Sequence, residues 1–397
     1  MVEIKIVKSK KDIKDFLKFV DILYKDAYAY VPPYKCCEKH LFSHKRNSNL
    51  DSNETTGFLA YQEGKVVGRI MGILNRIEMA NNKVVRFSHF DFINDSEVSF
   101  ALLDAICNWA KSLNAEFVIG DLGFNDLMQV GIEINNNSNK LATFQQRYNF
   151  LYYSEHLKNY GFQIQKKFNE YYLQLKEDFD EDNARILLDK NLSEKSLRFV
   201  EGTKKFKIAM YGRKIFDLLY ENSIFSYSTV VDDKSILDYF KLIDNLFESE
   251  DLKILINEND DVAGCMLLTK NTSLALQTTC GKVLVSKRMY NIGGEFKNEY
   301  DISLLVVNKN YMSSVCEIFA SILGVEAKNN NFYAIFSNLW INTDIKKDKF
   351  GMIFDIHNIR TRAILQKALV EKNKPIVKRG KSDLIGPIKK VFVNKLK

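Results

Sequence analysis

One stretch of the chain, residues 84–124, alternates in a way that predicts a strand, a turn, a helix and a second strand. Residues 84–93 are rich in β-branched and aromatic side chains, the pattern of a half-buried strand. Short polar side chains at 94–97 are typical of a helix start, and apolar residues recur at helical spacing over 98–113. Residues 117–120 are predicted to form the next strand. Such a unit favours a right-handed crossover, and a ligand is expected at the end of its first strand.

The pattern around this unit predicts more elements in the first half. They are a strand at 2–7, an amphipathic helix at 11–25, a hairpin with strands at 57–61 and 65–74, a helix at 144–160, and one or two strands within 162–175. Up to residue 120, the predicted order is therefore β-α-β-β-β-α-β.

A similar order begins again after an acidic, polar stretch. The predicted elements are a strand at 196–200, a helix at 205–220, a hairpin at 252–257 and 262–268, strands at 283–290 and 300–307, a helix at 313–323, and a strand at 332–339. The motif Asp21-Ile22-Leu23-Tyr24 also matches Asp217-Leu218-Leu219-Tyr220. We therefore predict a duplicated chain.

The length of 397 residues is too great for one ordinary core and favours two domains. The predicted boundaries are a first domain at 1–178, a linker at 179–192, a second, degenerate domain at 193–366, and a basic tail at 367–397. Charged residues make up 27% and hydrophobic residues 46% of the chain, as in globular proteins. No apolar run approaches the roughly 18 residues of a membrane span. The amino terminus also lacks a signal-peptide core, so we predict a cytoplasmic protein.

The positive charge lies at the end of the chain. Residues 367–397 contain ten Lys or Arg and two acidic residues, whereas the whole chain has a net charge of +7. The remainder is therefore close to neutral, and the basicity does not indicate a chain-wide nucleic-acid surface. Two interpretations of the tail remain: contact with anionic lipid or nucleic acid, or a solvated, partly ordered end.

A small group of potential metal ligands lies early in the chain. Cys36 and Cys37 precede His40 and His44, which are four residues apart. No second half at zinc-finger spacing accompanies them, and the chain has no Cys-x-x-Cys motif. A solvated loop is therefore the preferred interpretation, and no metal is predicted.

Several short motifs, in order over residues 57–175, resemble those of one superfamily. They are Val67-Gly68-Arg69-Ile70, Phe90-Asp91-Phe92 with Asp95 and Glu97, Ala101-Leu102-Leu103, Trp109-Ala110, Gly120 with Gly123-Phe124, Tyr148-Asn149 with Tyr152-Tyr153, and Gly161-Phe162. This set resembles the GNAT superfamily of N-acyltransferases and, more closely, a bacterial family of tandem GNAT-like proteins. The second half matches mainly in element order.

The resemblance implies an α/β protein with two GNAT-like domains, each a mixed, mostly antiparallel sheet flanked by helices. It also implies acyl transfer from acetyl-CoA or another acyl-CoA to an amine. In the superfamily, a glycine-containing loop at a helix start binds the pyrophosphate through backbone N–H groups. The equivalent stretch in the first half, 93–98, has no glycine and carries Asp95 and Glu97. These carboxylates would repel phosphate and suit a helix start, so we predict that they are caps.

The second half has a more suitable loop between its strand at 300–307 and the following helix. Lys309 adds a cation, and the two serines offer hydroxyl groups. Of this loop, Val307 and Tyr311 fit the superfamily pattern, whereas Met312, Val315 and Glu317 depart from it. The residues predicted to bind the cofactor are Val307, Asn308, Lys309, Asn310, Tyr311, Ser313 and Ser314. The alternative is an ordinary capped helix start.

The chemistry also requires a base and an acid. His89 and Asp91 are two apart on a predicted strand, so they project to one face, where a carboxylate beside an imidazole suits a general base. The alternative is a polar strand face covered by a loop. The superfamily often uses a tyrosine as the acid, but Leu157 occupies the matching position. Tyr153, one helical turn earlier, is the predicted substitute. In the second half, the resemblance places the equivalent helix at 358–369, where Gln366 offers no acid.

The sequence therefore predicts an acyl-CoA-dependent N-acyltransferase. Its acceptor would be a small-molecule amine or a peptide, held in a cleft between the two halves. The alternative is a catalytically silent GNAT-like protein that binds a small ligand or a partner.

Overall fold

The computed structural model of the protein describes residues 1–124, 130–138, 140–143, 146–221, 232–282, 299–330, 333–337 and 348–369. The elements of the first half are β1 (Glu3–Ile6), α1 (Lys10–Leu23), α2 (Lys35–Glu38), β2 (Asn53–Gln62), β3 (Lys65–Asn75), α3 (Arg76–Asn82), β4 (Val84–Phe92), α4 (Ser96–Ser112), β5 (Phe117–Gly120), β6 (Ile132–Asn136), α5 (Tyr152–Asn159) and β7 (Gln163–Leu175).

The second half begins with a helix. Its elements are α6 (Glu181–Glu194), β8 (Arg198–Phe199), α7 (Lys204–Glu221), α8 (Asp233–Ile243), β9 (Leu252–Ile256), β10 (Val262–Lys270), α9 (Ser273–Thr278), β11 (Glu299–Val307), α11 (Met312–Asn330), β12 (Tyr333–Ser337) and β13 (Phe354–Ala368). The strand predicted at 283–290 and the tail from residue 370 lie outside the described residues.

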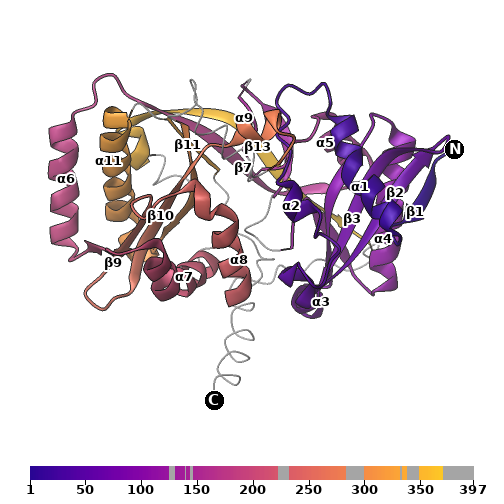
Figure 1. Ribbon diagram of the computed structural model, residues 1–397, viewed down its shortest axis with the longest axis horizontal. Coiled ribbons are helices and arrows are strands. Elements are labelled where there is room, and N and C mark those ends of the chain that lie inside the picture. Colours follow the sequence, from indigo (N-terminus) through magenta and orange to yellow (C-terminus); the bar gives the residue numbers. More distant parts are fainter. Residues whose placement is uncertain are drawn as a thin grey trace, which may run out of the picture.

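The described strands belong to one mixed sheet that runs through both halves (Figure 1). Its order is β1-β2-β3-β4-β5-β13-β7-β12-β11-β10-β9-β8, and β6 also pairs with β13. The pairs β4–β5 and β11–β12 are parallel, and the other described pairs are antiparallel. Strand β13, from the end of the described chain, therefore lies inside the sheet of the first half.

Three predicted segments differ from the structure. The stretch predicted as a linker is helix α6, which lies beside α11 in Figure 1 and is joined to it by a 2.8 Å hydrogen bond from Asn191 Nδ2 to Glu317 Oε2. The helix considered at 358–369 is strand β13 instead, so ordered structure continues past the predicted tail boundary at 366.

The helix predicted at 144–160 is also too long, because α5 begins at Tyr152. Asn149, which the prediction placed inside this helix, is instead held beside β6 by its side chain. The Asn149 amide accepts a hydrogen bond from the Glu133 N–H at 2.7 Å and donates to the Glu133 carbonyl at 3.1 Å. This side chain replaces a neighbouring strand and competes with a helical turn.

Each half contains the same irregularity in its central strand. Strands β4 and β5 pair only over Val84–Phe87, and β11 and β12 only over Glu299–Ile302. Among the described residues, neither parallel pairing continues past these positions. The antiparallel pairing with the neighbouring strand also shifts register there, between Arg69 and Met71 opposite a bulge in β4 and between Leu267 and Leu268 opposite a bulge in β11. Each half thus has an equivalent position at which its parallel pairing ends, which we call its opening.

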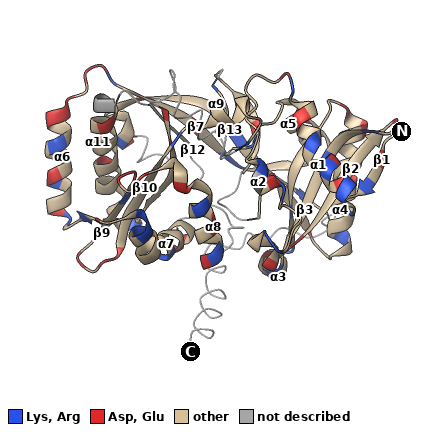
Figure 2. Cartoon of the chain, in the orientation of Figure 1, with Lys and Arg blue, Asp and Glu red and all other residues tan. Residues whose placement is uncertain are grey.

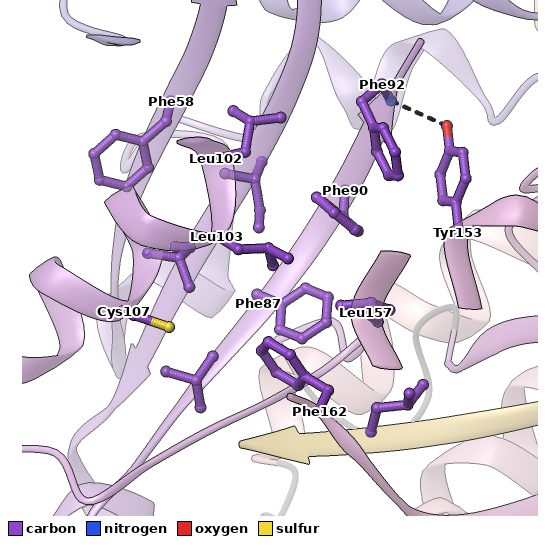
Figure 3. Packing of buried hydrophobic residues seen from close by; sticks show 14 of the residues in the cluster. Phe58, Phe87, Phe90, Phe92, Leu102, Leu103, Cys107, Tyr153, Leu157 and Phe162 are labelled. Atoms are coloured by element: carbon purple, nitrogen blue, oxygen red, sulfur yellow. Dashed lines mark hydrogen bonds between the residues drawn. The ribbon is translucent and has the colours of Figure 1, made fainter. Parts of the chain in front are cut away.

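Helix α4 covers the first opening on one side. Its buried side chains, including Val98, Leu102 and Ile106, pack with Phe87, Phe90 and Phe92 of β4 in one hydrophobic cluster (Figure 3). Close packing needs glycine beneath the helix, because a Cβ at Gly72 would lie 2.3 Å from the Trp109 ring. Charged side chains are frequent on the helices around the sheet in Figure 2. None of the described helices has the length and hydropathy required to span a membrane.

A cluster of four buried charges fixes β13 in the first half. Arg360 and Arg362 are fully buried, as are Glu133 of β6 and Glu170 of β7. The Arg362 Nε donates a short hydrogen bond to Glu170, and Arg360 Nη1 lies 3.3 Å from Glu170 Oε2. Both guanidinium groups also lie 3.5 Å from Glu133 Oε2. Each charge thus has an opposite charge beside it, as burial requires.

We expect Arg362→Met to destabilise the protein by about 3–5 kcal/mol, because it removes one of the two guanidinium groups and leaves two buried carboxylates beside Arg360 alone within this cluster. Urea unfolding measures the loss. The matched control is Arg76→Met, which breaks a 2.9 Å ion pair with Glu54 between side chains that are both more than half exposed. The control should cost less than about 1 kcal/mol. Equal losses in the two variants would contradict a structural role for the cluster.

Candidate functional site

His89 lies at the bulge of β4, with a positive backbone φ of 52°. Its ring is buried against Phe16 of α1, at 5.9 Å between centroids. Nδ1 lies 2.8 Å from Ser88 Oγ, while Nε2 lies 3.3 Å from Arg147 Nη2 and 3.4 Å from Glu38 Oε1. A guanidinium can only donate and an ionised carboxylate can only accept, so Nε2 faces one donor and one acceptor, and each of these two contacts suits a different tautomer of the ring.

The charges around this ring set its protonation. Burial and the Arg147 cation lower the pKa of His89 to about 4, although Glu38 acts in the opposite direction. Burial alone would raise the pKa of Glu38, but His89 and the cations of Arg69 and Arg147 hold it at about 2. At neutral pH the site therefore contains a neutral imidazole beside an ionised carboxylate. Glu38 and Arg147 are partly exposed, at 18% and 16% of their side chains, so this cluster is open to solvent.

Arg147 joins His89 to a second carboxylate. Its Nη1 lies 3.4 Å from Asp121 Oδ2, and Asp121 follows directly after β5. Burial raises the pKa of Asp121 to about 6, against the lowering effect of Arg147. The other carboxylate oxygen, Oδ1, is buried without a hydrogen-bond partner. Asp121 thus holds a proton more readily than an ordinary aspartate.

Asp91 belongs to a different and fully buried network. It accepts hydrogen bonds from Arg69 Nε and from the Tyr24 hydroxyl, both at 2.7 Å. The Tyr24 and Tyr153 oxygens are 2.8 Å apart, and Tyr153 Oη accepts from the Phe92 N–H at 3.1 Å (Figure 3). Because the Tyr24 proton goes to the carboxylate, Tyr153 must donate to Tyr24. Every proton in this chain is already committed.

The three predicted catalytic residues therefore fall into two networks. Asp91 and Tyr153 are linked through Tyr24, and both are buried. His89 has no recorded hydrogen bond to Asp91, and Glu38 is the carboxylate beside it instead. The hydrogen-bonded pair expected from the spacing of His89 and Asp91 does not form. Burial strongly raises the pKa of Tyr153, and its proton points toward Tyr24.

The opening of the first half is filled by the chain itself. Tyr153 binds the N–H of Phe92 and Tyr152 Oη donates to its carbonyl at 2.6 Å, so both backbone groups at the end of β4 are paired. Asp95 is the N-cap of α4 and accepts from the Glu97 N–H at 2.8 Å. The prediction that Asp95 caps this helix is confirmed. A carboxylate at this helix start repels a phosphate group.

The equivalent loop of the second half is more exposed. Val307 is buried at the end of β11, and Asn308 caps the short 3₁₀ turn Lys309–Tyr311 by accepting from the Asn310 N–H at 3.0 Å. The side chains of Lys309, Asn310 and Ser313 are exposed. Tyr311 Oη accepts from Asn257 Nδ2 at 3.4 Å, and Ser314 is half-buried. Residues 307–314 contain no acidic side chain.

Sequence reasoning missed the partners that organise both networks. Tyr24, Glu38 and Arg147 come from segments far from β4 in the chain. Of the residues that bind Asp91 or His89, only Arg69 could have been recognised from the sequence, because it is a charged residue within an apolar strand pattern. Among the described side chains, no group of three or more His, Cys, Asp or Glu gathers as metal ligands would.

Comparisons with known proteins show what this chain resembles. No protein-family model matches it. Protein YghO of Escherichia coli (strain K12) is 28% identical over 128 residues, which is 32% of this chain and 33% of YghO. The match thus spans about a third of that relative's length.

Two solved structures cover nearly the whole chain. A tandem GNAT protein from the clavulanic acid biosynthesis pathway aligns with 94% of this chain and 100% of its own, at 10% identity and a TM-score of 0.51. A GCN5-related N-acetyltransferase from Sphaerobacter thermophilus aligns with 94% of this chain and 98% of its own, at 7% identity and a TM-score of 0.47. The similarity to the tandem GNAT protein shows the fold of this chain. The chain has the tandem GNAT fold, which confirms the predicted fold class.

We expect His89 to make stability depend on pH. Its folded pKa is about 4 and lies below the ordinary value of 6.5, so the unfolded chain binds the proton more tightly. The stability that the neutral ring contributes is present above pH 6.5 and is lost as the pH falls through 4, by up to about 3 kcal/mol.

Urea unfolding at several pH values between 7 and 4 measures this loss. His89→Asn, which tolerates a positive φ, should remove that part of the pH dependence. His357→Gln, at an exposed position of β13, is the control and should leave the slope unchanged. The same slope in wild type and His89→Asn would contradict a buried neutral histidine.

Proposed function

We propose that the protein is an acyl-CoA-dependent N-acyltransferase whose second half binds the cofactor. The fold is that of the tandem GNAT proteins, and an N-acyltransferase activity fits it. The observation that carries the proposal is the difference between two equivalent openings. One is filled by tyrosines and a carboxylate cap, and the other is followed by an exposed, cation-bearing helix start.

The residues present at the second opening fit a pyrophosphate group in part. Lys309 supplies a positive charge, and the first turn of α11 directs backbone N–H groups toward the loop. The hydroxyl groups of Ser313 and Ser314 lie in the same turn and add donors. The loop contains no glycine, so its backbone approaches a phosphate less closely than the superfamily loop does.

The proposed acceptor is an amine held near the junction of the two halves. Bound acyl-CoA would supply its acyl group as a thioester. The reaction joins the amine nitrogen to the acyl carbon, breaks the C–S bond, releases CoA as the thiol, and leaves one ammonium proton to be accepted. His89 is the group proposed to accept it, because its ring is neutral and lies beside ionised, partly exposed Glu38. Asp91 and Tyr153 are proposed to support the site from behind, through their buried chain.

A second candidate function is a catalytically silent protein that binds a small ligand or a partner. The closed chain Asp91–Tyr24–Tyr153 favours it, because this chain leaves Tyr153 no uncommitted proton to donate to a thiolate. Cofactor binding separates the two candidates.

We expect calorimetric titration to show micromolar binding of acetyl-CoA and CoA to the full chain, and Lys309→Glu to weaken it by about tenfold or more. The charge reversal places a carboxylate where the proposed pyrophosphate binds. Lys205→Glu, at an exposed position of α7, is the matched control and should bind like wild type.

Two results would count against the cofactor site. Binding that is equal in Lys309→Glu and Lys205→Glu would remove the second-half loop from the proposal. No binding at millimolar ligand would remove the acyltransferase and leave the silent ligand-binding protein.

A further inference from the structure

One arginine of β13 binds the backbone of the segment that carries Arg147. Arg362 is fully buried, and its Nη1 donates hydrogen bonds to the carbonyl oxygens of Arg147, at 2.7 Å, and Gly131, at 3.2 Å. Its Nε donates to Glu170 of β7, which anchors the guanidinium group. Arg362 therefore joins the charge cluster that fixes β13 in the sheet to the backbone beside the candidate site.

The side chain of Arg147 is held at its other end by Asp121. Arg147 Nη1 lies 3.4 Å from Asp121 Oδ2, and the Asp121 carbonyl accepts a hydrogen bond from the Gly131 N–H at 2.8 Å. Because Arg362 also binds Gly131, the two ties belong to one connected group of hydrogen bonds. A long side chain that is fixed at its backbone and at its guanidinium group keeps little rotamer freedom.

The guanidinium group of Arg147 ends against His89. Its Nη2 lies 3.3 Å from His89 Nε2, and its Nη1 lies 3.4 Å from Ser88 Oγ, which in turn lies 2.8 Å from His89 Nδ1. Arg147 thus contacts one ring nitrogen directly and the other through Ser88. The other charges that act on the ring are Glu38 of α2, which favours the imidazolium, and Arg69 of β3, which opposes it.

A cation that stays beside His89 keeps the ring in the neutral form that a base requires, because a second positive charge nearby is unfavourable. The position of Arg147 must be fixed for this effect to last, since its side chain is 16% exposed and water offers the guanidinium another partner. We propose that Arg147 is a positioning residue that keeps His89 neutral, and that Arg362 and Asp121 hold Arg147 in place. Strand β13 thus completes the candidate base of the first half. This inference rests on the proposed function, in which His89 accepts the amine proton.

The test is an NMR titration of the His89 ring in the full chain, with isotope-labelled histidine, from about pH 8 to pH 4. The chain has five histidines, and His89→Asn identifies the signal. Wild type should reach half-protonation only near the lower end of this range, since the pKa of His89 is about 4. Arg147→Gln should raise the midpoint by about 1 pH unit or more, because it removes the cation beside the ring.

Two conservative variants separate positioning from a general loss of the buried charge cluster. Arg362→Lys keeps the positive charge but cannot bind its carboxylate and both carbonyl oxygens at once. Arg147 is then held less firmly, and the midpoint should rise by about 0.5 pH unit or more. Arg360→Lys is the matched control, because it makes the same exchange in the same cluster but its carbonyl partner is Lys140. Its midpoint should equal that of wild type.

Asp121→Asn tests the second tie and replaces Arg362→Lys if that variant does not fold. Loss of an anion near His89 would by itself lower the midpoint, so a rise can come only from movement of Arg147. We expect a rise of about 0.5 pH unit. Urea unfolding of each variant shows that it is folded and how much stability it loses.

An unchanged midpoint in Arg147→Gln would overturn the inference, as would an unchanged midpoint in a folded Arg362→Lys or an unchanged or lowered one in Asp121→Asn. Equal rises in Arg362→Lys and Arg360→Lys would also overturn it, because they would show a general loosening of the cluster. These midpoints need no cofactor, so failure of CoA binding overturns the acyltransferase alone and leaves the positioning of His89 standing.

Discussion

Arg360 and Arg362 are buried on the last described strand, and both are neutralised by Glu133 and Glu170 from the first half. Two guanidinium groups can leave water only where carboxylates and carbonyl oxygens meet them, and the register of β13 places each of the four charges beside an opposite charge. That register places β13 between β5 and β7. The first half is therefore completed by a strand that follows the second half in the chain, and the halves share one sheet.

The shared sheet contains two equivalent openings, which differ in the groups that surround them. In the first half, tyrosines from α5 pair with the backbone at the end of β4 and fill the opening. The filling is stable because each hydroxyl and each backbone group there has a partner. In the second half, the loop after β11 keeps an exposed lysine and no acidic residue. The end of the central strand is thus closed by paired groups in the first half, whereas the second half carries the loop at which we propose that the cofactor binds.

Local patterns were sufficient to predict elements whose partners are near in sequence. The unit β4–α4–β5 and both hairpins were predicted correctly, because their apolar spacing reports burial directly. Strand β13 was taken for a helix because the resemblance placed the last helix of the second half at residues 358–369. The partner of its buried Arg360, Glu170, lies 190 residues away in the chain, and no local pattern reports such a distance.

Local sequence patterns were limited in the same way when they were used to predict the site. Alternation correctly assigned His89 and Asp91 to a strand, but it could not reveal the bulge of that strand at His89, opposite the register shift between Arg69 and Met71. Nor could it reveal Glu38, which reaches His89 from a four-residue helix 51 positions earlier. The cap at Asp95 was predictable because a cap acts on its own helix.

The two networks on β4 differ in one property that decides what each can do. The Asp91 network is fully buried, and the protons of Tyr24 and Tyr153 are both donated within it. Such a chain fixes positions but exchanges no proton unless it opens. The His89 network includes partly exposed Glu38 and Arg147, and Nε2 lies between a donor and an acceptor. The proposed function therefore assigns acceptance of the amine proton to the His89 network and a supporting role to the Asp91 network.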